Sequence, residues 1–185
     1  MWAVPFWLTL LSPSIRAPVL VDGLETVNRW RSSKAAKIEV ERNPRRVWEG
    51  GGCMRLTFKV DLKRKPPWWE CVERSDLDLP LPREVRLWIF PLDHPAIYVL
   101  LQDPSRGTAF FSVKCLKVRE WNLVSLPLDV AAIWGKRPKR LREIRFCVHP
   151  EMGFPKSGEF SYLVDGVEAV YDWALGPSTK RHVVE

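Results

Sequence analysis

The clearest pattern in the chain is the alternation of apolar and polar residues over residues 160–171, FSYLVDGVEAVY. Alternation of this length predicts a β-strand, because successive side chains of a strand point to opposite faces. Leu163 and Val167 are expected on one face and Tyr162 on the other. Asp165 interrupts the apolar face, and a buried carboxylate needs hydrogen-bond donors or a cation. We therefore expect Asp165 at the rim of the core or in a polar or metal site.

Similar alternating segments recur along the chain at intervals of about 8 to 15 residues, separated by turn-forming residues. They predict strands over residues 19–24, 37–41, 53–61, 84–90, 96–101, 108–116, 121–128, 141–148 and 160–171. Residues 63–82 are rich in proline and predict an irregular segment, while residues 129–134 predict a single helical turn. About eight or nine strands without a long helix predict an all-β sandwich or barrel. We propose that its first and last strands meet.

Length and composition indicate one globular domain, since 46% of the 185 residues are hydrophobic and 28% are charged. Residues 19–172 are assigned to this domain and residues 173–185 to a polar C-terminal tail. Residues 1–18 hold a short apolar run followed by small residues, which predicts a possible signal peptide or, alternatively, an N-terminal strand. The run is shorter than the about 20 apolar residues of a membrane-spanning helix, so no membrane span is expected.

The formal net charge of +7 raises the question of nucleic-acid binding. The densest basic run is KRPKRLREIR, residues 136–145, and no helix or aromatic–basic motif accompanies it. A solvated basic turn is the preferred interpretation. Nucleic acid is therefore not the expected partner, although a single stripe of these side chains would favour it.

Cysteine and histidine placement gives no sign of a metal or redox centre. Cys53, Cys71, Cys115 and Cys147 are far apart, which allows disulfides in an exported chain or buried free thiols. The sequence contains no HExxH, GxSxG, P-loop or GxGxxG pattern. Paired catalytic carboxylates need only spatial proximity, but few polar groups remain for such a site. No enzymatic activity and no catalytic residues are expected.

Five motifs in order give the chain a family resemblance. They are VDGLE with a tryptophan five residues on, WEGGGCMRLTF, DLDLPLPREVRLWIF, EWNLVSLPL and YLVDGVEAV. In this order and spacing they resemble the galactose-binding-like β-sandwiches, or jelly rolls, found in carbohydrate-binding modules of glycoside hydrolases. The resemblance covers residues 19–172. It implies a jelly-roll β-sandwich of about eight or nine mostly antiparallel strands.

The resemblance also implies a structural calcium ion between the first and last strands. The family's carboxylates fall on Glu25 and Asp165, with Asp22 nearby, and calcium takes six to eight oxygen ligands. Gly166 stands where a second aspartate is common. The alternative is that Glu25 and Asp165 accept hydrogen bonds from the backbone at the edge of the sandwich.

Sugar binding in this fold commonly uses the outward face of one sheet, where aromatic rings stack on pyranoses and polar side chains bind hydroxyls. The residues expected to bind ligand here are Arg86, Trp88, Tyr98, Phe110, Arg145 and Tyr162 on strands, and Trp68 and Trp69 from the adjoining loop. Gln102 and His149 are expected on the same outward surface. Alternatively, Trp88 and Phe110 are covered by loops and form a second core.

The preferred hypothesis is a non-catalytic glycan-binding protein, secreted or periplasmic, that binds a polysaccharide or oligosaccharide. The second hypothesis is a protein-interaction or assembly domain of the same fold, whose aromatic face is covered. The third is a basic nucleic-acid binder. The fold alone does not decide between them.

Overall fold

The computed structural model describes residues 15–65, 68–114 and 116–173. The expected signal peptide falls almost entirely outside these ranges, as do Cys115 and all but the first residue of the predicted tail. Two six-stranded sheets make up the domain, and every strand pair in the described ranges is antiparallel. The predicted all-β sandwich is confirmed.

The first sheet, sheet A, has the order β10–β7–β14–β4–β3, with β1 paired to the free part of β14. Its strands are β1 (Ile15–Asp22), β3 (Ala36–Glu41), β4 (Cys53–Val60), β7 (Glu84–Pro91), β10 (Asn122–Pro127) and β14 (Gly158–Trp173).

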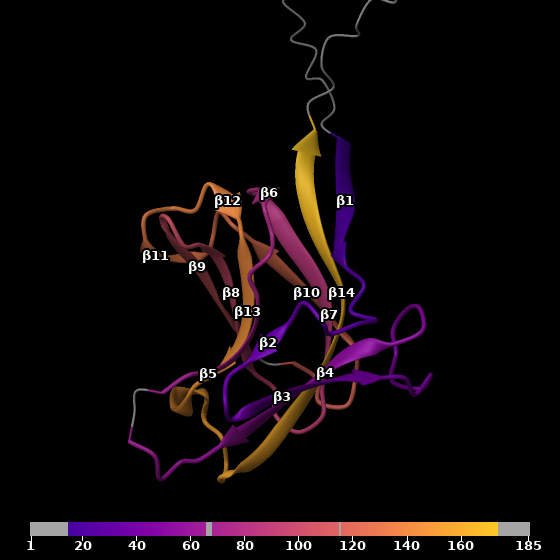
Figure 1. Ribbon diagram of the computed structural model, residues 1–185, viewed down its shortest axis with the longest axis vertical. Helices are drawn as coiled ribbons and strands as arrows, with labels where there is room; N and C mark the ends of the chain where they lie inside the picture. The colour runs from indigo at the N-terminus through magenta and orange to yellow at the C-terminus, as the bar shows by residue number, and fades with distance from the viewer. Residues whose placement is uncertain (1–14, 66–67, 115, 174–185) are drawn as a thin grey trace, which may run out of the picture.

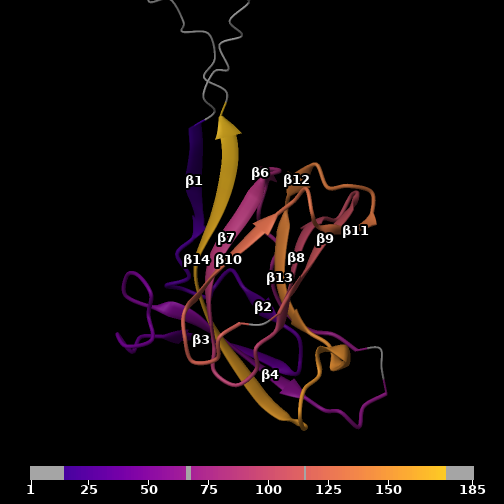
Figure 2. The same ribbon diagram turned by 180° about the vertical axis from the view of Figure 1, so that it is seen from behind.

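The second sheet, sheet B, has the order β11–β9–β8–β13–β5–β2. Its strands are β2 (Arg31–Ser32), β5 (Glu70–Arg74), β8 (Ile97–Asp103), β9 (Gly107–Val113), β11 (Ala132–Gly135) and β13 (Glu143–Val148). A small ribbon joins β6 (Leu79–Pro80) to β12 (Arg140–Leu141), and a 3-10 turn, η1, spans Pro150–Met152. Both views of the ribbon show β7, β10 and β14 on one side and β8, β9 and β13 on the other (Figures 1 and 2).

The first and last strands of the sandwich pair with each other, as predicted. Val19 lies opposite Ala169, and the pairing runs outward to Ile15 and Trp173. The two strands extend together beyond the rest of the sandwich (Figure 1). β1 begins at Ile15, four residues before the expected start of the domain.

A β-bulge in β14 changes which residues face the core. The register against β7 shifts between Asp165 and Glu168, and Gly166 has a φ of 54°. An extra residue in one strand reverses the alternation after it, so Tyr162 and Val167 both lie in the core. The outward face predicted for Tyr162 is therefore wrong. The prediction assumed that side chains alternate without interruption along the strand, whereas the bulge reverses which residues face the core.

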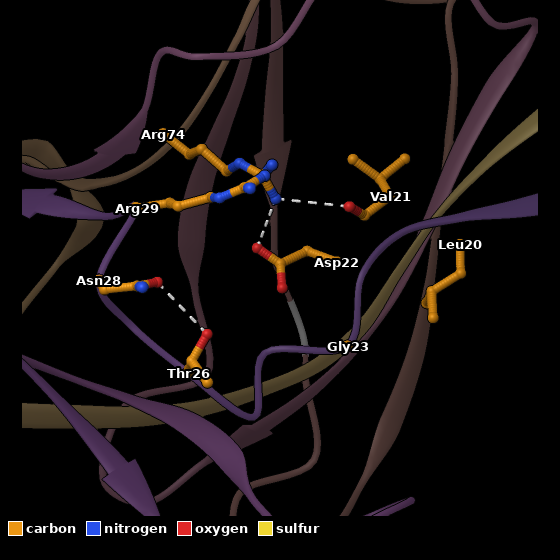
Figure 3. A pocket seen from close by; sticks show the side chains of 8 residues that line it. All are labelled: Leu20, Val21, Asp22, Gly23, Thr26, Asn28, Arg29 and Arg74. Atoms are coloured by element: carbon orange, nitrogen blue, oxygen red, sulfur yellow. Dashed lines mark hydrogen bonds and ion pairs between the residues drawn. The ribbon is translucent and has the colours of Figure 1, made fainter.

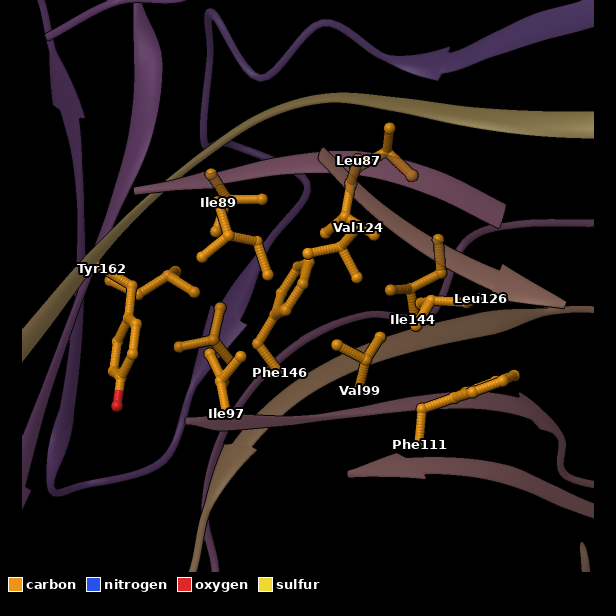
Figure 4. Packing of buried hydrophobic residues seen from close by; sticks show 14 of the residues in the cluster. Leu87, Ile89, Ile97, Val99, Phe111, Val124, Leu126, Ile144, Phe146 and Tyr162 are labelled. Atoms are coloured by element: carbon orange, nitrogen blue, oxygen red, sulfur yellow. The ribbon is translucent and has the colours of Figure 1, made fainter. Parts of the chain in front are cut away.

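The core fills the space between the inner faces of the two sheets (Figure 4). Leu87 and Ile89 of β7 meet Val99 of β8 and Phe146 of β13, all at most 1% exposed. Phe146 stacks on Trp30 with ring centroids 5.6 Å apart. One continuous apolar cluster thus joins the sheets and fixes which side chains remain on their outer faces.

Two segments differ from the expected elements. Residues 63–82, expected to be irregular, contain β5 and β6. Residues 129–134, expected to form a helical turn, lead into β11, which pairs with β9. The strands of each segment form their hydrogen bonds with a strand that is distant in the sequence, and a local sequence pattern does not reveal such a partner.

The remaining sequence predictions concern thiols and membrane spans. Cys71 and Cys147 form a disulfide across neighbouring strands, and Cys53 is a buried free thiol. Burial raises the pKa of Cys53 to about 12. Within the described ranges, the structure has no helix long and apolar enough to cross a membrane.

Candidate functional site

Four aromatic side chains gather on the outer face of sheet B. We call Trp69, Tyr98, Phe110 and Trp134 the aromatic platform. Tyr98 is on β8, Phe110 on β9 and Trp134 on β11, while Trp69 immediately precedes β5. Side chains alternate along each strand, so the neighbours of these residues face inward and the platform faces out.

The platform rings form one cluster, in which the centroid of the Trp69 ring lies 6.4 Å from that of Phe110 and 6.0 Å from that of Trp134. Trp134 stacks on Phe110 with centroids 4.6 Å apart and planes at 19°. Phe110 lies 4.9 Å from Tyr98, and Trp69 lies 5.4 Å from Tyr98 and 4.6 Å from the His149 ring. Each such contact stabilises by about 0.5–1.5 kcal/mol. Trp134 is 48% exposed, whereas Tyr98 is 8% exposed and Trp69 and Phe110 are half-buried, so Trp134 is the platform ring most available to a ligand.

Polar side chains border the platform on the same outer face, and we call Glu73, Gln102, Glu143 and Arg145 the polar border. Arg145 of β13 lies 2.9 Å from a carboxylate oxygen of Glu73 and also contacts Glu143. Gln102 of β8 stands opposite Glu143 in the ladder and is half-buried. Burial raises the pKa of Glu143, and the hydrogen bond from Arg145 opposes that change. This edge offers hydrogen-bonding groups without a large net charge.

Two other predicted ligand residues lie on the opposite side of the molecule, on the outer face of sheet A. Trp88 of β7 is covered by Trp48, with ring centroids 3.8 Å apart. Arg86 donates to both carboxylate oxygens of Glu84, at 2.6 and 3.3 Å. The structure thus separates Arg86 and Trp88 from Tyr98, Phe110 and Arg145, because β7 and β8 follow each other in the chain but lie in different sheets.

The last two predicted ligand residues are in the interior. Tyr162 is 0% exposed and its hydroxyl donates to the carbonyl of Ala96 at 2.7 Å. Burial raises the pKa of its phenol. Trp68 is 3% exposed, and its indole nitrogen has no hydrogen-bond partner among the described residues. Neither ring reaches the outer face on which Trp69 lies.

Trp134 is the platform residue that the sequence prediction missed. The signal was weak, because Trp134 ends a short apolar segment that resembles one helical turn as closely as a strand. The pairing of Trp134 with Thr108 and of Ile133 with Ala109 decides the matter. Pairing with a strand more than twenty residues away is not visible in a local pattern.

The predicted calcium ligands lie close to each other at the bulge. The Oδ2 atom of Asp165 accepts N–H groups from Trp48 and Glu49 at 3.1 and 3.2 Å, and Oε1 of Glu25 accepts the N–H of Gly51 at 3.1 Å. Burial raises the pKa of Asp165, while these backbone donors lower it. Both carboxylates therefore anchor the loop between β3 and β4.

A cavity of about 350 Å³ beside the bulge is lined by Glu25, Glu49, Asp165 and Glu168 among others. Even so, no group of three or more histidine, cysteine or acidic side chains in the described ranges is placed to hold a metal ion. The hydrogen bonds that Glu25 and Asp165 accept are those that the backbone-capping alternative predicts.

A second cavity, of about 390 Å³, opens near the end of β1 (Figure 3). Arg74, which is 6% exposed, reaches Asp22 and Asp76 at 2.7 Å each. The indole of Trp30 also donates to Asp22, at 2.9 Å. These contacts neutralise Arg74 internally, so the cluster ties β1 to β5 and leaves little charge for a ligand.

The sequence matches no family model and no curated protein, whereas several solved structures share the fold. One is the family 11 carbohydrate-binding module of a cellulosomal cellulase from Clostridium thermocellum. It is 11% identical, with 85% of this chain and 95% of that chain covered and a TM-score of 0.58. The same module in complex with a β-1,3-1,4-mixed-linked tetrasaccharide is 13% identical, with 84% and 96% covered and a TM-score of 0.57.

An exo-β-agarase is similar over only part of its length. It is 11% identical and has a TM-score of 0.56, with 83% of this chain but 24% of the agarase chain covered. The shared region is therefore about a quarter of that larger protein. Together, these likenesses show that the chain has the β-sandwich fold of carbohydrate-binding modules.

Proposed function

We propose that this protein is a non-catalytic carbohydrate-binding module that holds a glycan on the outer face of sheet B. The observation that carries the proposal is the aromatic platform, a set of contacting rings that ends in the half-exposed Trp134. Because sugar rings present apolar C–H faces, they stack on such rings, and nearby polar groups bind their hydroxyls.

The polar border supplies the second half of a sugar site. Gln102 lies on β8, the strand of Tyr98, and Arg145 lies on the neighbouring strand β13, where Glu73 holds it in place. A pyranose on the platform would find donors and acceptors along this border. The tetrasaccharide complex of the family 11 module supports an oligosaccharide as the class of ligand.

The absence of catalysis is part of the proposal. Glu73 and Glu143 are the carboxylates of the polar border, and both are engaged by Arg145. A general acid needs both a raised pKa and access to its substrate; Glu143 has the raised pKa but is only 5% exposed, and Glu73 is held by Arg145. The agarase match supports the same view, since the shared fold accounts for a minor part of that chain.

We further propose that the protein works outside the cytoplasm, secreted or in the periplasm. The support is the disulfide between Cys71 and Cys147, which persists in oxidising compartments.

A structural calcium ion is a separate proposal. It is supported by the four carboxylates around one cavity, Glu25, Glu49, Asp165 and Glu168, and opposed by the N–H groups that already occupy Oδ2 of Asp165 and Oε1 of Glu25. Thermal unfolding in calcium and in EDTA tests it. An increase of several degrees in Tm with calcium supports the ion, and an unchanged Tm leaves backbone capping as the role of these residues.

Protein binding is the alternative function, and one observation favours it. Trp48 and Leu123 on the outer face of sheet A are 46% and 56% exposed. They could form the centre of a contact with another protein, since exposed apolar groups near one another often mark such sites. This reading places the functional face on the opposite side from the aromatic platform.

Affinity electrophoresis against a panel of polysaccharides tests the two readings with one matched pair of variants. Trp134→Ala removes the exposed ring of the platform, and Trp48→Ala removes a ring of nearly equal exposure from the other face. We expect at least one glycan to retard the wild type and Trp48→Ala but not Trp134→Ala. Retardation by no glycan, or loss of retardation in Trp48→Ala alone, would contradict the proposal.

A further inference from the structure

Four basic residues converge at the end of sheet B, next to the aromatic platform. We call Arg106, Lys136, Arg137 and Lys139 the basic corner. They come from two turns, one between β8 and β9 and one between β11 and β12, which are hydrogen-bonded to each other. The N–H of Lys136 donates to the carbonyl of Arg106 at 3.1 Å, and the guanidinium of Arg106 donates to the carbonyl of Arg137 at 3.0 Å.

The charges of the basic corner are not neutralised by neighbouring side chains. None of its members forms an ion pair with a carboxylate in the described ranges, whereas Arg140 and Arg142, from the same basic run, both pair with Asp78. The carboxylate that the corner does contact is Asp103, which is 2% exposed and accepts the N–H of Lys139 at 3.2 Å. Lys136, Arg137 and Lys139 are exposed, and Arg106 is half-exposed.

The basic corner continues directly from the platform. In the pairing of β11 with β9, Trp134 lies opposite Thr108 and Gly135 opposite Gly107, and Lys136 is the next residue of the chain. The turns approach so closely that a side-chain carbon on Gly107 would lie 2.3 Å from the carbonyl oxygen of Lys136. Gly135 has a φ of 82°, so the chain turns there, and two residues span at most about 7 Å. A ligand stacked on Trp134 would therefore have its next groups beside unpaired cations.

We propose that the ligand of the platform is an anionic polysaccharide, carrying carboxylate or sulfate groups, and that the basic corner binds these groups. The inference rests on the proposed function and specifies its class of ligand. The chain of sugars runs along the β9–β11 edge, with one ring on Trp134 and a neighbouring anionic group near Lys136.

The polar border explains why the anionic group of the ligand lies toward the basic corner and not toward Arg145. Arg145 is already paired with Glu73 and Glu143, so that side of the platform has no unpaired cation for an anionic group. An anionic group at the basic corner, by contrast, meets unpaired cations and is attracted. The hydroxyls of neutral sugars are then left to the polar border.

Nucleic acid is the competing polyanion, and the structure favours it less. The basic run of residues 136–145 does not form one continuous stripe, because Arg140, Arg142 and Arg145 are each paired with carboxylates. A compact corner beside a ring platform suits an occasional anionic group on a sugar chain better than the dense charge of a duplex.

The experiment compares polysaccharides that share a backbone but differ in whether it carries anionic groups. Dextran is paired with dextran sulfate, and fully methyl-esterified polygalacturonate with polygalacturonate, in titrations at low and moderate salt. We expect one anionic member to bind at least about tenfold more tightly than its neutral partner, with an affinity that falls as salt screens the charges. The sulfate and carboxylate pairs identify which group is recognised.

Two double variants with the same change in net charge locate the effect. Lys136→Ala/Lys139→Ala should weaken binding of the anionic glycan about 3- to 10-fold, as expected for two exposed ion pairs, and leave binding of neutral glycans unchanged. Lys34→Ala/Lys59→Ala removes exposed lysines beside β2 and on β4, away from β11, and should change affinity less than twofold.

Each other outcome overturns the inference. Equal affinity for neutral and anionic members, still abolished by Trp134→Ala, refutes the ligand class and leaves the proposed function in place. Equal losses in the two double variants would assign the effect to net charge alone. Duplex DNA that binds as tightly as the anionic glycan, with the same sensitivity to Lys136→Ala/Lys139→Ala, would make the corner a nucleic-acid site. Binding to no polysaccharide at all refutes the proposed function itself.

Discussion

Individual tryptophans in this protein have opposite roles that exposure and contacts distinguish. Trp30 and Trp68 are at most 6% exposed and belong to the core, whereas Trp134 and Trp48 are about half exposed on opposite outer faces. The same residue type therefore contributes to stability at one position and is available to a ligand at another.

Core and platform aromatics should respond differently to truncation. Phe146→Ala should lower the free energy of unfolding by about 3–5 kcal/mol, since it removes a fully buried ring. Trp134→Ala should lower it by about 1 kcal/mol or less, because half of the ring already faces water. Urea unfolding measures both, and a loss for Trp134→Ala as large as that for Phe146→Ala would show that the platform is structural.

Glu143 should make stability depend on pH. Burial raises its pKa in the folded state, so wild-type stability decreases as pH rises above the unfolded value of about 4.3 and through the raised pKa. Glu143→Gln removes this titration, while Arg145 keeps its contact with Glu73. The variant should therefore gain stability relative to wild type between pH 4 and pH 7 in urea unfolding; a constant difference would show that Glu143 does not titrate in this range.

At the scale of elements, β14 is the strand that organises sheet A. It pairs with β4 and β7 along its first half and with β1 and β7 along its second, and its bulge lies between them. The bulge turns Asp165 outward under the β3–β4 loop while Val164 and Val167 remain in the core.

The bulge should depend on the backbone freedom of Gly166. Gly166→Ala should lower the free energy of unfolding by about 1–2 kcal/mol, because an L-residue disfavours its φ of 54°. An added methyl group there would meet only an ordinary contact, 3.7 Å from Trp88. Gly51→Ala is the control, since Gly51 has no positive φ and open space around it; similar losses in both variants would argue against strain at the bulge.

The disulfide should stabilise sheet B through its constraint on the unfolded chain. Cys71 and Cys147 are 76 residues apart, and closing a loop of that length is worth about 4 kcal/mol in the chain-entropy model. Cys71→Ala/Cys147→Ala should therefore lower the free energy of unfolding by about 2–4 kcal/mol. Mass spectrometry of the wild type under non-reducing conditions establishes the bond first, and an unchanged stability in the variant would contradict its structural role.

Sequence alternation predicted the strands with the strongest two-sided pattern and the meeting of the first and last of them. It failed where a face depends on something outside the pattern. The bulge at Gly166 reversed the face of Tyr162, and pairing with β9 made Trp134 part of a strand. Tyr98, Phe110 and Arg145 were predicted on an outward face, but their separation from Arg86 and Trp88 follows from the division into two sheets, which no local pattern specifies.

For the whole molecule, the two outer faces offer two different surfaces. Sheet B presents the aromatic platform, its polar border and the basic corner, whereas sheet A presents Trp88 covered by Trp48 of the β3–β4 loop. The fold it shares with carbohydrate-binding modules does not decide which face is used. The side chains favour sheet B, because the half-exposed Trp134, the polar border and the unpaired cations of the basic corner adjoin one another there.

The most direct test is an NMR titration of the indole N–H signals with a glycan that retards the protein in electrophoresis. Each tryptophan gives one such signal, so the spectrum reports both faces at once. We predict that the signals of Trp69 and Trp134 shift with a common dissociation constant. Those of Trp48, Trp88 and Trp121, whose ring centroid lies 6.2 Å from that of Trp48, should stay in place. Shifts confined to Trp48, Trp88 and Trp121 would contradict the assignment of the glycan site to sheet B.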